Sequence, residues 1–240
     1  GEYQPGWMLL SYGKKVSVSS SLEGYPAENI VDEDARTAWV AQSNRDMEWA
    51  QVDLQRLSSI HAIQVNFDEY GANQKGAVSG VYQSYLIYAS VNGEDWSLVV
   101  DYGTKKTDTP HDYIEFEEPF KARYIKLQNK EYMVSENFSV RDLRIFGKGQ
   151  GSTPRAVNDF TVERDEADPC KARLCWEAVP DAQGYIVRYG IAGDKLYNNF
   201  QVMGENTLEI GSLNKGVAYY FTIDAYNENG ITRTSRIKVC

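Results

Sequence analysis

Alternation of apolar and polar residues is the feature that most limits what this chain can fold into. It runs through the segments between Trp49 and Phe146, and no long stretch repeats its apolar residues with the 3.6-residue period of a helix. In one of these segments Ile63, Val65 and Phe67 fall on the same face, as in a half-buried strand. The alternation predicts an all-β fold of the sandwich type.

Turn-forming residues separate the alternating segments. Asn92-Gly93 lies between two strand patterns and predicts a β-hairpin. The only plausible helical piece, residues 25–34, has Pro26 near its start and supports one or two turns at most. We therefore expect a meander or jelly-roll sandwich in the first part of the chain.

A change of composition after the last of these strands predicts a second domain. Residues 149–154 are rich in small and flexible residues and read as a linker, after a first domain over residues 1–148. Alternation and turn signals resume over residues 155–240, which predicts a second, smaller sandwich. The total of 240 residues is enough for two hydrophobic cores.

Charge and composition narrow the classes of partner. The formal net charge is −9, so nucleic acid and anionic membrane surfaces are disfavoured partners, and no apolar run is long enough to span a bilayer. Only two histidines are present, and the sequence has no phosphate-binding glycine loop, no zinc-protease motif and no CxxC pair. We expect a monomeric, non-catalytic chain without membrane insertion.

Several segments in order resemble one known family. SSSLEGYPAENIVDEDARTAWVA, EWAQVDLQRLSSIHAIQVNF, YLIYASVNGEDWSLV, ARYIKLQN and VRDLRIFG together resemble the discoidin domain, also called the coagulation-factor C-type domain, over residues 8–148. Within that family the chain is similar in style to the family 32 carbohydrate-binding modules of bacterial glycoside hydrolases. The resemblance implies a jelly-roll sandwich whose loops bind carbohydrate at one end.

Sugar rings stack on aromatic side chains while a few polar groups hold their hydroxyls, so loop residues of both kinds are candidates for the binding site. The segment KEYMVSENF, residues 130–138, is the preferred aromatic platform, because the family often uses this position. The predicted carbohydrate-binding residues are Arg45, Tyr70, Asn73, Tyr82, His111, Tyr132, Asn137 and Phe138.

The resemblance also implies a structural calcium ion, since calcium takes six to eight oxygen ligands from carboxylates, hydroxyls and carbonyls. Glu33 stands where the family has Gly, which places the backbone of this loop in question. In the alternative interpretation Asp32 and Asp34 only cap a turn. The predicted ligands are Asn29, Asp32, Asp34, Thr37 and Asp142.

Residues 154–240 resemble a fibronectin type III domain. Trp176 matches the core tryptophan of the second strand, and Tyr185 an inward position of the third. Leu213 followed by Tyr219 matches the tyrosine corner of such domains. The resemblance implies a second, immunoglobulin-like sandwich.

In that topology Cys170 and Cys240 lie at the same pole, whereas Cys175 points the other way. We therefore expect a Cys170–Cys240 disulfide, which suits an extracytoplasmic compartment, either periplasmic, cell-surface or secreted.

Together these resemblances imply the non-catalytic accessory part of a secreted bacterial glycan-degrading protein that binds carbohydrate. Two alternatives remain. Both modules brace a catalytic domain of the same polypeptide, of the arabinosidase or xylosidase kind, in which case an exposed apolar patch is expected around residues 7–10. In the other alternative the chain mediates cell adhesion, although it has no Arg-Gly-Asp motif.

Overall fold

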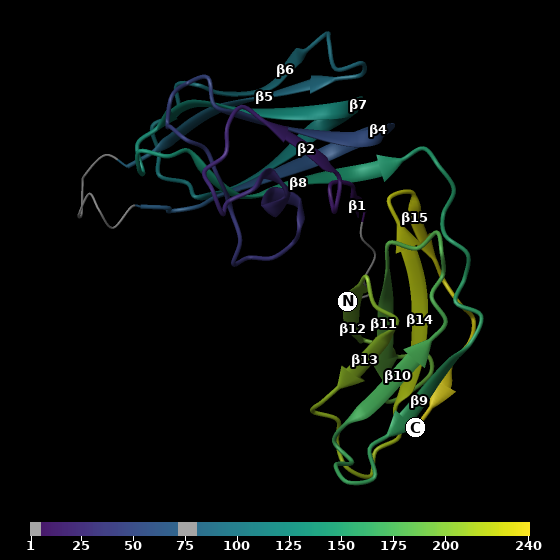
Figure 1. Ribbon diagram of the computed structural model, residues 1–240. Helices are drawn as coiled ribbons and strands as arrows, with labels where there is room; N and C mark the ends of the chain where they lie inside the picture. Colours follow the sequence, from purple (N-terminus) through teal and green to yellow (C-terminus); the bar gives the residue numbers. More distant parts are fainter. Residues whose placement is uncertain (1–5, 72–80) are drawn as a thin grey trace. The chain divides into compact units, whose positions relative to one another are not determined.

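The structure is a computed structural model that describes residues 6–71 and 81–240 (Figure 1). Its regular elements are strands apart from one short helix among the described residues. The chain divides into two compact units, one formed by Leu9–Gln150 and the other mainly by Gly151–Cys240. Its elements are β1 (Met8–Leu9), β2 (Lys15–Val18), the 3-10 helix η1 (Ala27–Val31), β3 (Trp39–Val40), β4 (Trp49–Phe67), β5 (Gln83–Ser90), β6 (Ser97–Tyr102), β7 (His111–Tyr132), β8 (Ser139–Gly149), β9 (Phe160–Arg164), β10 (Ala172–Trp176), β11 (Gly184–Gly190), β12 (Asn198–Met203), β13 (Thr207–Ile210), β14 (Tyr220–Asn227), β15 (Gly230–Thr232) and β16 (Lys238–Val239).

The strands of the N-terminal unit form one eight-stranded sheet that folds into two layers. Its order is β1-β8-β4-β7-β5-β6, with β2 paired to β4 and β3 paired to β8. The first part of β4 pairs with β2, its later part pairs with β8, and β7 accompanies both parts. The long strands β4 and β7 therefore pass from one layer of the sandwich to the other.

A local break in β4 produces this change of layer. The pairing register of β4 shifts between Asp53 and Ser58, and within this interval Gln55 has a φ of 66°. The Gln55 N–H donates to the Asp53 carboxylate at 2.7 Å, a short-range bond that stabilises the turned backbone. Apolar side chains alternate inward on both sides of the break, as the sequence predicts.

An aromatic cluster fills the core of the N-terminal unit. Trp39, Phe67, Tyr85, Tyr132 and Phe138 are all buried, each with an exposed fraction of at most 2%. The Trp39 and Phe138 rings meet edge to face with their centres 5.7 Å apart, and the Tyr132 and Phe138 rings do so at 5.4 Å. Such edge-to-face pairs add stability beyond that of buried area.

Two short-range predictions are confirmed. β5 and β6 form a hairpin across the turn that contains Asn92-Gly93, where Gly93 adopts a φ of 81°. The predicted helical piece is the short 3-10 helix η1, which follows Pro26 and buries Ala27, Ile30 and Val31. In the described part of the chain no helix is long and apolar enough to cross a membrane.

The C-terminal unit is a smaller two-sheet β-structure. One sheet has the order β13-β10-β9, and the other has the order β12-β11-β14-β15 with β16 paired to β14. Trp176 and Tyr185 lie between the sheets with their ring centres 5.2 Å apart. The second all-β module predicted from the sequence is thus present.

The predicted Cys170–Cys240 disulfide is wrong for this structure, in which all three cysteines are free thiols. A hydrogen-bonded arginine ties the segment that precedes Cys170 to the loop before β14. The Arg164 guanidinium donates to the carbonyls of Pro169 at 2.5 Å and Val217 at 3.1 Å, and it lies 5.3 Å from the centre of the Tyr219 ring. Cys240 is packed against the core of this unit through its pairing with Tyr219.

Candidate functional site

Loops gather at the end of the N-terminal sandwich where β4 and β7 both begin and end. The Tyr132 hydroxyl at the end of β7 donates to the Asp68 carbonyl just after β4. The Asn129 N–H donates to the Glu48 carbonyl just before β4, at 2.9 Å. We call this region the loop end. It comprises residues 41–48, 68–71, 103–110 and 133–138, with Tyr82 just before β5.

Asparagine side chains hold the loop end in a fixed arrangement. The amide of the fully buried Asn129 donates to the carbonyls of Asn44 at 2.8 Å and Arg45 at 2.9 Å. The amide of Asn137 donates to the Ala41 carbonyl at 2.8 Å. Because the loop 41–48 is tied to its neighbours by these buried bonds, the side chains that it carries are held ready for a partner.

The prediction that Tyr132 and Phe138 form an exposed aromatic platform is wrong. Their exposed fractions are 1% and 0%, and both rings belong to the aromatic core. A register shift explains Tyr132: Tyr85 pairs with Asn129 but Ser84 pairs with Glu131, so β7 contains one extra residue. This bulge turns Tyr132 inward. Asn137, the third residue predicted in this segment, uses its amide to fasten the loop.

Four other side chains form the polar surface of the loop end. Tyr82 is half-buried, and its hydroxyl donates to the Glu131 carboxylate at 2.8 Å, which raises the pKa of Tyr82. The Lys106 ammonium lies 5.7 Å from the centre of the Tyr82 ring. Exposed Arg45 is anchored to the same stretch of β7 through its carbonyl. We call Tyr82, Lys106 and Glu131, together with the exposed Arg45 of the loop 41–48, the Tyr82 cluster.

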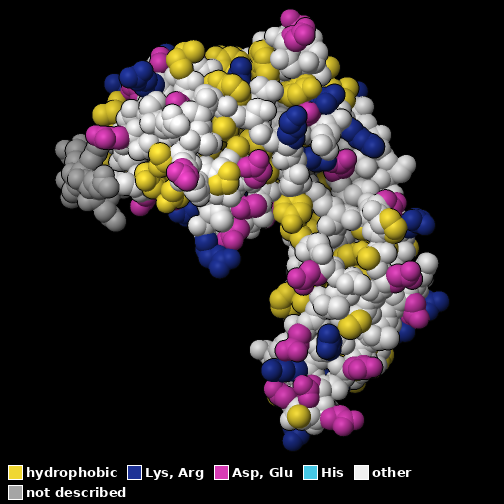
Figure 2. All heavy atoms as spheres, viewed as in Figure 1, with side chains coloured by type: hydrophobic (Ala, Val, Ile, Leu, Met, Phe, Trp, Pro, Cys, Tyr) yellow, Lys and Arg dark blue, Asp and Glu magenta, His cyan; other side chains and the backbone are white. Residues whose placement is uncertain are grey.

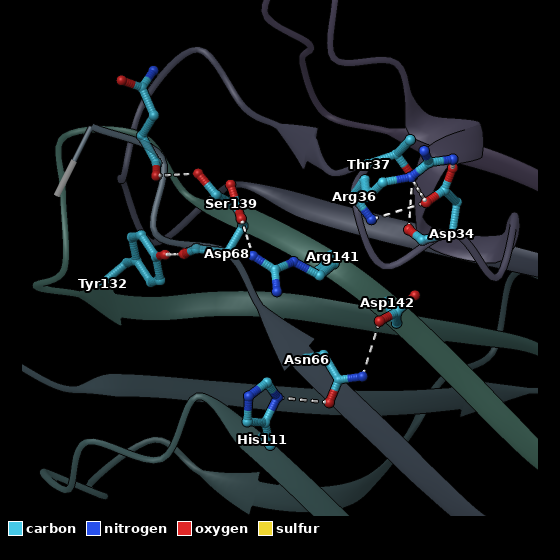
Figure 3. A network of polar contacts seen from close by, with 11 residues as sticks. Asp34, Arg36, Thr37, Asn66, Asp68, His111, Tyr132, Ser139, Arg141 and Asp142 are labelled. Atoms are coloured by element: carbon cyan, nitrogen blue, oxygen red, sulfur yellow. Dashed lines mark hydrogen bonds and ion pairs between the residues drawn. The ribbon is translucent and has the colours of Figure 1, made fainter.

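The other predicted binding residues lie outside the Tyr82 cluster. Tyr70 is half-buried against Tyr25, with ring centres 5.0 Å apart. Exposed His111 lies at the start of β7, where its Nδ1 is 3.1 Å from the side-chain oxygen of Asn66 (Figure 3). Asn73 lies outside the described residues.

Sequence reasoning missed Lys106 and Glu131. Simple alternation along β7 buries residues 125, 127 and 129 and would place Glu131 inward as well. Only the bulge brings its carboxylate to the surface beside Tyr82. No signal in the sequence marks that bulge.

Two of the predicted calcium ligands, Asp32 and Asp142, lie close enough to affect one another electrostatically. Asp142 has an exposed fraction of only 7%, and it accepts a hydrogen bond from the Asn66 amide at 2.9 Å (Figure 3). Burial raises the pKa of Asp142, and the nearby charge of Asp32 contributes in the same direction. Asp32 itself accepts hydrogen bonds from the Thr37 hydroxyl at 2.6 Å and the Asp34 N–H at 2.9 Å. A buried Asp142 and a half-buried Asp32 that repel one another are a pair of charges that a cation would neutralise.

The remaining acidic groups of this loop already have cationic partners. Arg36 donates twice to the Asp34 carboxylate and holds the pKa of Asp34 down at about 2. Glu33 adopts the positive φ expected of a glycine, 57°, and its carboxylate accepts from Arg144 at 3.0 Å.

No three Asp, Glu, His or Cys side chains are grouped to hold a metal among residues 6–71 and 81–240. Any cation at Asp32 and Asp142 therefore needs further oxygens from Thr37, from backbone carbonyls or from Asn29, whose amide nitrogen donates to the Ala38 carbonyl at 2.8 Å.

Comparison with known proteins gives matches to the N-terminal unit. The rat (Rattus norvegicus) protein lactadherin is 33% identical over 110 residues, which is 43% of this chain and 25% of lactadherin, and mouse (Mus musculus) lactadherin is 32% identical over the same length. The chain thus spans about a quarter of the length of these relatives.

Among solved structures, chitosan-binding module 1 from a Paenibacillus chitosanase/glucanase is 20% identical with a TM-score of 0.49, over 58% of this chain and 99% of that one. The family 32 module of Clostridium perfringens NanJ in complex with galactose is 18% identical with a TM-score of 0.47, over 58% of this chain and 98% of that one.

The family model for the F5/8 type C domain matches residues 15–142, more than half of the 240-residue chain. The matched range contains β2 to β7, the whole loop end and the start of β8. It also agrees with the discoidin-like sandwich predicted for residues 8–148. The chain therefore belongs to the F5/8 type C family, whose domain is a non-catalytic binding module.

Proposed function

We propose that the N-terminal unit binds carbohydrate at the loop end through the Tyr82 cluster. The observation that supports this proposal is a half-exposed tyrosine ring held in position by Glu131 and Lys106, at the loop end that also carries the exposed Arg45. A sugar ring stacks on such an aromatic face, and the charged groups around it bind the hydroxyls. Binding needs no covalent chemistry and little rearrangement, because the loops are already fastened by buried amide bonds.

In this proposal the chain is an accessory region of a secreted bacterial glycan-degrading protein. The F5/8 type C match supports a binding role, and the predicted extracytoplasmic location suits a polysaccharide target. Detection of the natural protein only in the cytoplasm would contradict this context.

Replacement of Tyr82 or Arg45 by alanine tests the site. Each variant keeps the backbone carbonyl that fastens it, to Met133 for Tyr82 and to Asn129 for Arg45, so the fold is preserved. We expect Tyr82→Ala to weaken glycan binding about tenfold, roughly 1.4 kcal/mol, and Arg45→Ala by at least as much. The measurement is a glycan array followed by calorimetric titration of the best glycan.

Tyr197→Ala is the matched control, because Tyr197 is 64% exposed and lies in the C-terminal unit. Its binding should equal that of the unaltered protein. If Tyr82→Ala and Arg45→Ala bind glycan as the unaltered protein does, the Tyr82 cluster is not the binding site. If the unaltered protein binds no glycan on the array, carbohydrate binding by this chain is refuted.

We also propose that Asp32 and Asp142, with oxygens from Thr37 and Asn29, hold a calcium ion. The ion would neutralise the buried Asp142 and the half-buried Asp32, whose mutual repulsion otherwise costs stability. Glu33 and Arg144 support this loop from outside through their ion pair.

We expect Asp142→Asn to raise the stability of the N-terminal unit in a chelator but to remove the stabilisation that calcium gives the unaltered protein. In a chelator, the pKa of Asp142 is higher in the folded protein than in the unfolded chain, so protonation of this carboxyl group stabilises the fold. This stabilisation is present at low pH and is lost as the pH rises through the folded-state pKa. At neutral pH without metal the variant should therefore melt at a higher temperature than the unaltered protein. With calcium the unaltered protein should gain stability and the variant should not. Identical melting of the unaltered protein in chelator and in calcium would rule out the ion.

For the C-terminal unit we infer a fibronectin type III fold. Three observations support it: the division into sheets β13-β10-β9 and β12-β11-β14-β15, the buried Trp176, and the Tyr219 hydroxyl that accepts from the Asn214 N–H at 3.0 Å. The last contact is the kind that defines a tyrosine corner. An experimental structure with another strand order would contradict this assignment.

A bracing role for the C-terminal unit is the second candidate. Ile191, Tyr197 and Phe200 near β11 and β12 have exposed fractions of 66%, 64% and 43%, as expected for residues that pack on a neighbouring domain. The apolar segment where such a surface was predicted, residues 7–10, is instead largely buried, since Met8 and Leu10 are 9% and 1% exposed. If this surface is a docking face, addition of the neighbouring domain of the natural polypeptide should protect it from hydrogen exchange, and unchanged exchange would exclude the role.

A further inference from the structure

Three aromatic rings surround a lysine on the outer face of β4, β5 and β7. The Lys126 ammonium lies 4.2 Å from the centre of the Trp96 ring, 5.7 Å from that of Tyr88 and 5.9 Å from that of Trp49. We call these four residues the Lys126 cage. None of them belongs to the Tyr82 cluster.

The register of the sheet explains the arrangement. Lys126 pairs with Gln51 of β4 on one side and with Tyr88 of β5 on the other, while Trp49 pairs with Gln128. Side chains on neighbouring strands at the same level share a face, so Gln51 and Gln128 accompany the rings. Figure 2 shows that hydrophobic and basic side chains lie next to one another on parts of the surface of the N-terminal unit.

The charge of Lys126 lacks an anionic counterpart. In the described ranges no carboxylate forms an ion pair with Lys126, and Asp53 on the neighbouring strand is held by Arg123 at 2.8 Å. Partial burial lowers the pKa of Lys126, as expected when a charge loses water without gaining a counter-ion. Cation–π contacts compensate only part of that loss.

Few ligands match aromatic faces, amide groups and an uncompensated cation on one open surface. A neutral sugar uses the rings and the amides but leaves the ammonium unpaired. A small anion pairs with the ammonium but does not use the rings. A sugar ring that carries a carboxylate uses all three, because its C–H face stacks on tryptophan while its carboxylate pairs with the ammonium.

We propose that the Lys126 cage is a second binding surface, specific for an acidic sugar of the uronate class. The carboxylate of the sugar pairs with Lys126, its ring stacks on Trp96 or Trp49, and Gln51 and Gln128 hydrogen-bond its hydroxyls. This surface is independent of carbohydrate binding at the loop end, and either site can exist without the other.

Calorimetric titration with trigalacturonic acid tests the proposal, with galactotriose as the neutral probe of the same ring stereochemistry. We expect the acidic trisaccharide to bind at least tenfold more tightly than the neutral one, and the difference to shrink as salt is added. Lys126→Met keeps the length and apolar stem of the side chain and should weaken binding of the acidic probe at least tenfold. Trp96→Ala should weaken both probes.

One control variant separates the charge of Lys126 from the other charges of its strand. Lys121→Met removes an exposed positive charge from β7 and should bind trigalacturonic acid as the unaltered protein does. Tyr82→Ala, which alters the loop end, is measured alongside to show whether the acidic sugar binds there instead. Equal affinity for the two probes, or full affinity of a Lys126→Met variant with normal thermal stability, would overturn the proposal. Loss of binding in Tyr82→Ala but not in Lys126→Met would assign the acidic sugar to the loop end instead.

Discussion

Phe138→Ala is expected to lower the free energy of unfolding of the N-terminal unit by about 3–5 kcal/mol, the usual range for a buried phenylalanine. The ring is fully buried and meets Trp39 and Tyr132 edge to face. Its removal leaves a cavity between two rigid aromatic rings, which cannot move together without shifting the strands that carry them. The measurement is chemical denaturation, monitored by the fluorescence of tryptophan, since Trp39 reports directly on this part of the core.

A surface variant in the same segment provides the comparison. Met133 is 48% exposed, so Met133→Ala should change the free energy of unfolding by no more than about 0.5 kcal/mol. If Phe138 were instead the aromatic platform for a ligand, its variant would unfold like the Met133 variant and lose only glycan binding. A normal denaturation curve for Phe138→Ala would therefore restore the interpretation that the structure overturns.

The contrast between Ile63 and Tyr132 shows where reasoning from the sequence succeeds and where it stops. Ile63, Val65 and Phe67 alternate without interruption, and all three are buried as the period of a strand requires. The same rule fails for Tyr132, because one extra residue in β7 changes which side chains point inward. A bulge depends on pairing with β5, which is a tertiary property, and the local sequence does not reveal it.

Only part of the candidate site can be predicted from the sequence, and the reason is again tertiary structure. Arg45 and Tyr82 are loop residues of the right chemistry, and both remain exposed or half exposed. Their neighbours Lys106 and Glu131 come from other segments, and their proximity depends on how β5 and β7 end. Glu33 was expected to disturb its loop, yet it adopts the positive φ of a glycine and pairs with Arg144 on β8, a partner 111 residues away in sequence.

Lys105→Met is expected to destabilise the N-terminal unit by about 3 kcal/mol, the lower end of the range for breaking a buried ion pair. The Lys105 ammonium contacts both oxygens of the Asp112 carboxylate at 3.0 Å, and their side chains are only 23% and 11% exposed. The Tyr85 hydroxyl donates to the same carboxylate at 2.6 Å. Burial and the neighbouring carboxylate raise the pKa of Tyr85, so this phenol stays protonated and continues to donate. Without Lys105, however, a buried negative charge keeps one neutral donor and loses its counter-ion.

The double variant Lys105→Met with Asp112→Asn separates the cost of an unpaired charge from the loss of packing. An asparagine at position 112 still accepts a hydrogen bond from Tyr85 but carries no charge, so the double variant should recover at least half of the stability lost in Lys105→Met. Lys148→Met, which removes an exposed lysine of β8, should leave the free energy of unfolding nearly unchanged. A double variant less stable than Lys105→Met alone would contradict this account. It would mean that water solvates the charge of Asp112 well enough without Lys105. The ammonium would then act mainly through its contact with the Tyr102 ring, whose centre is 4.6 Å away.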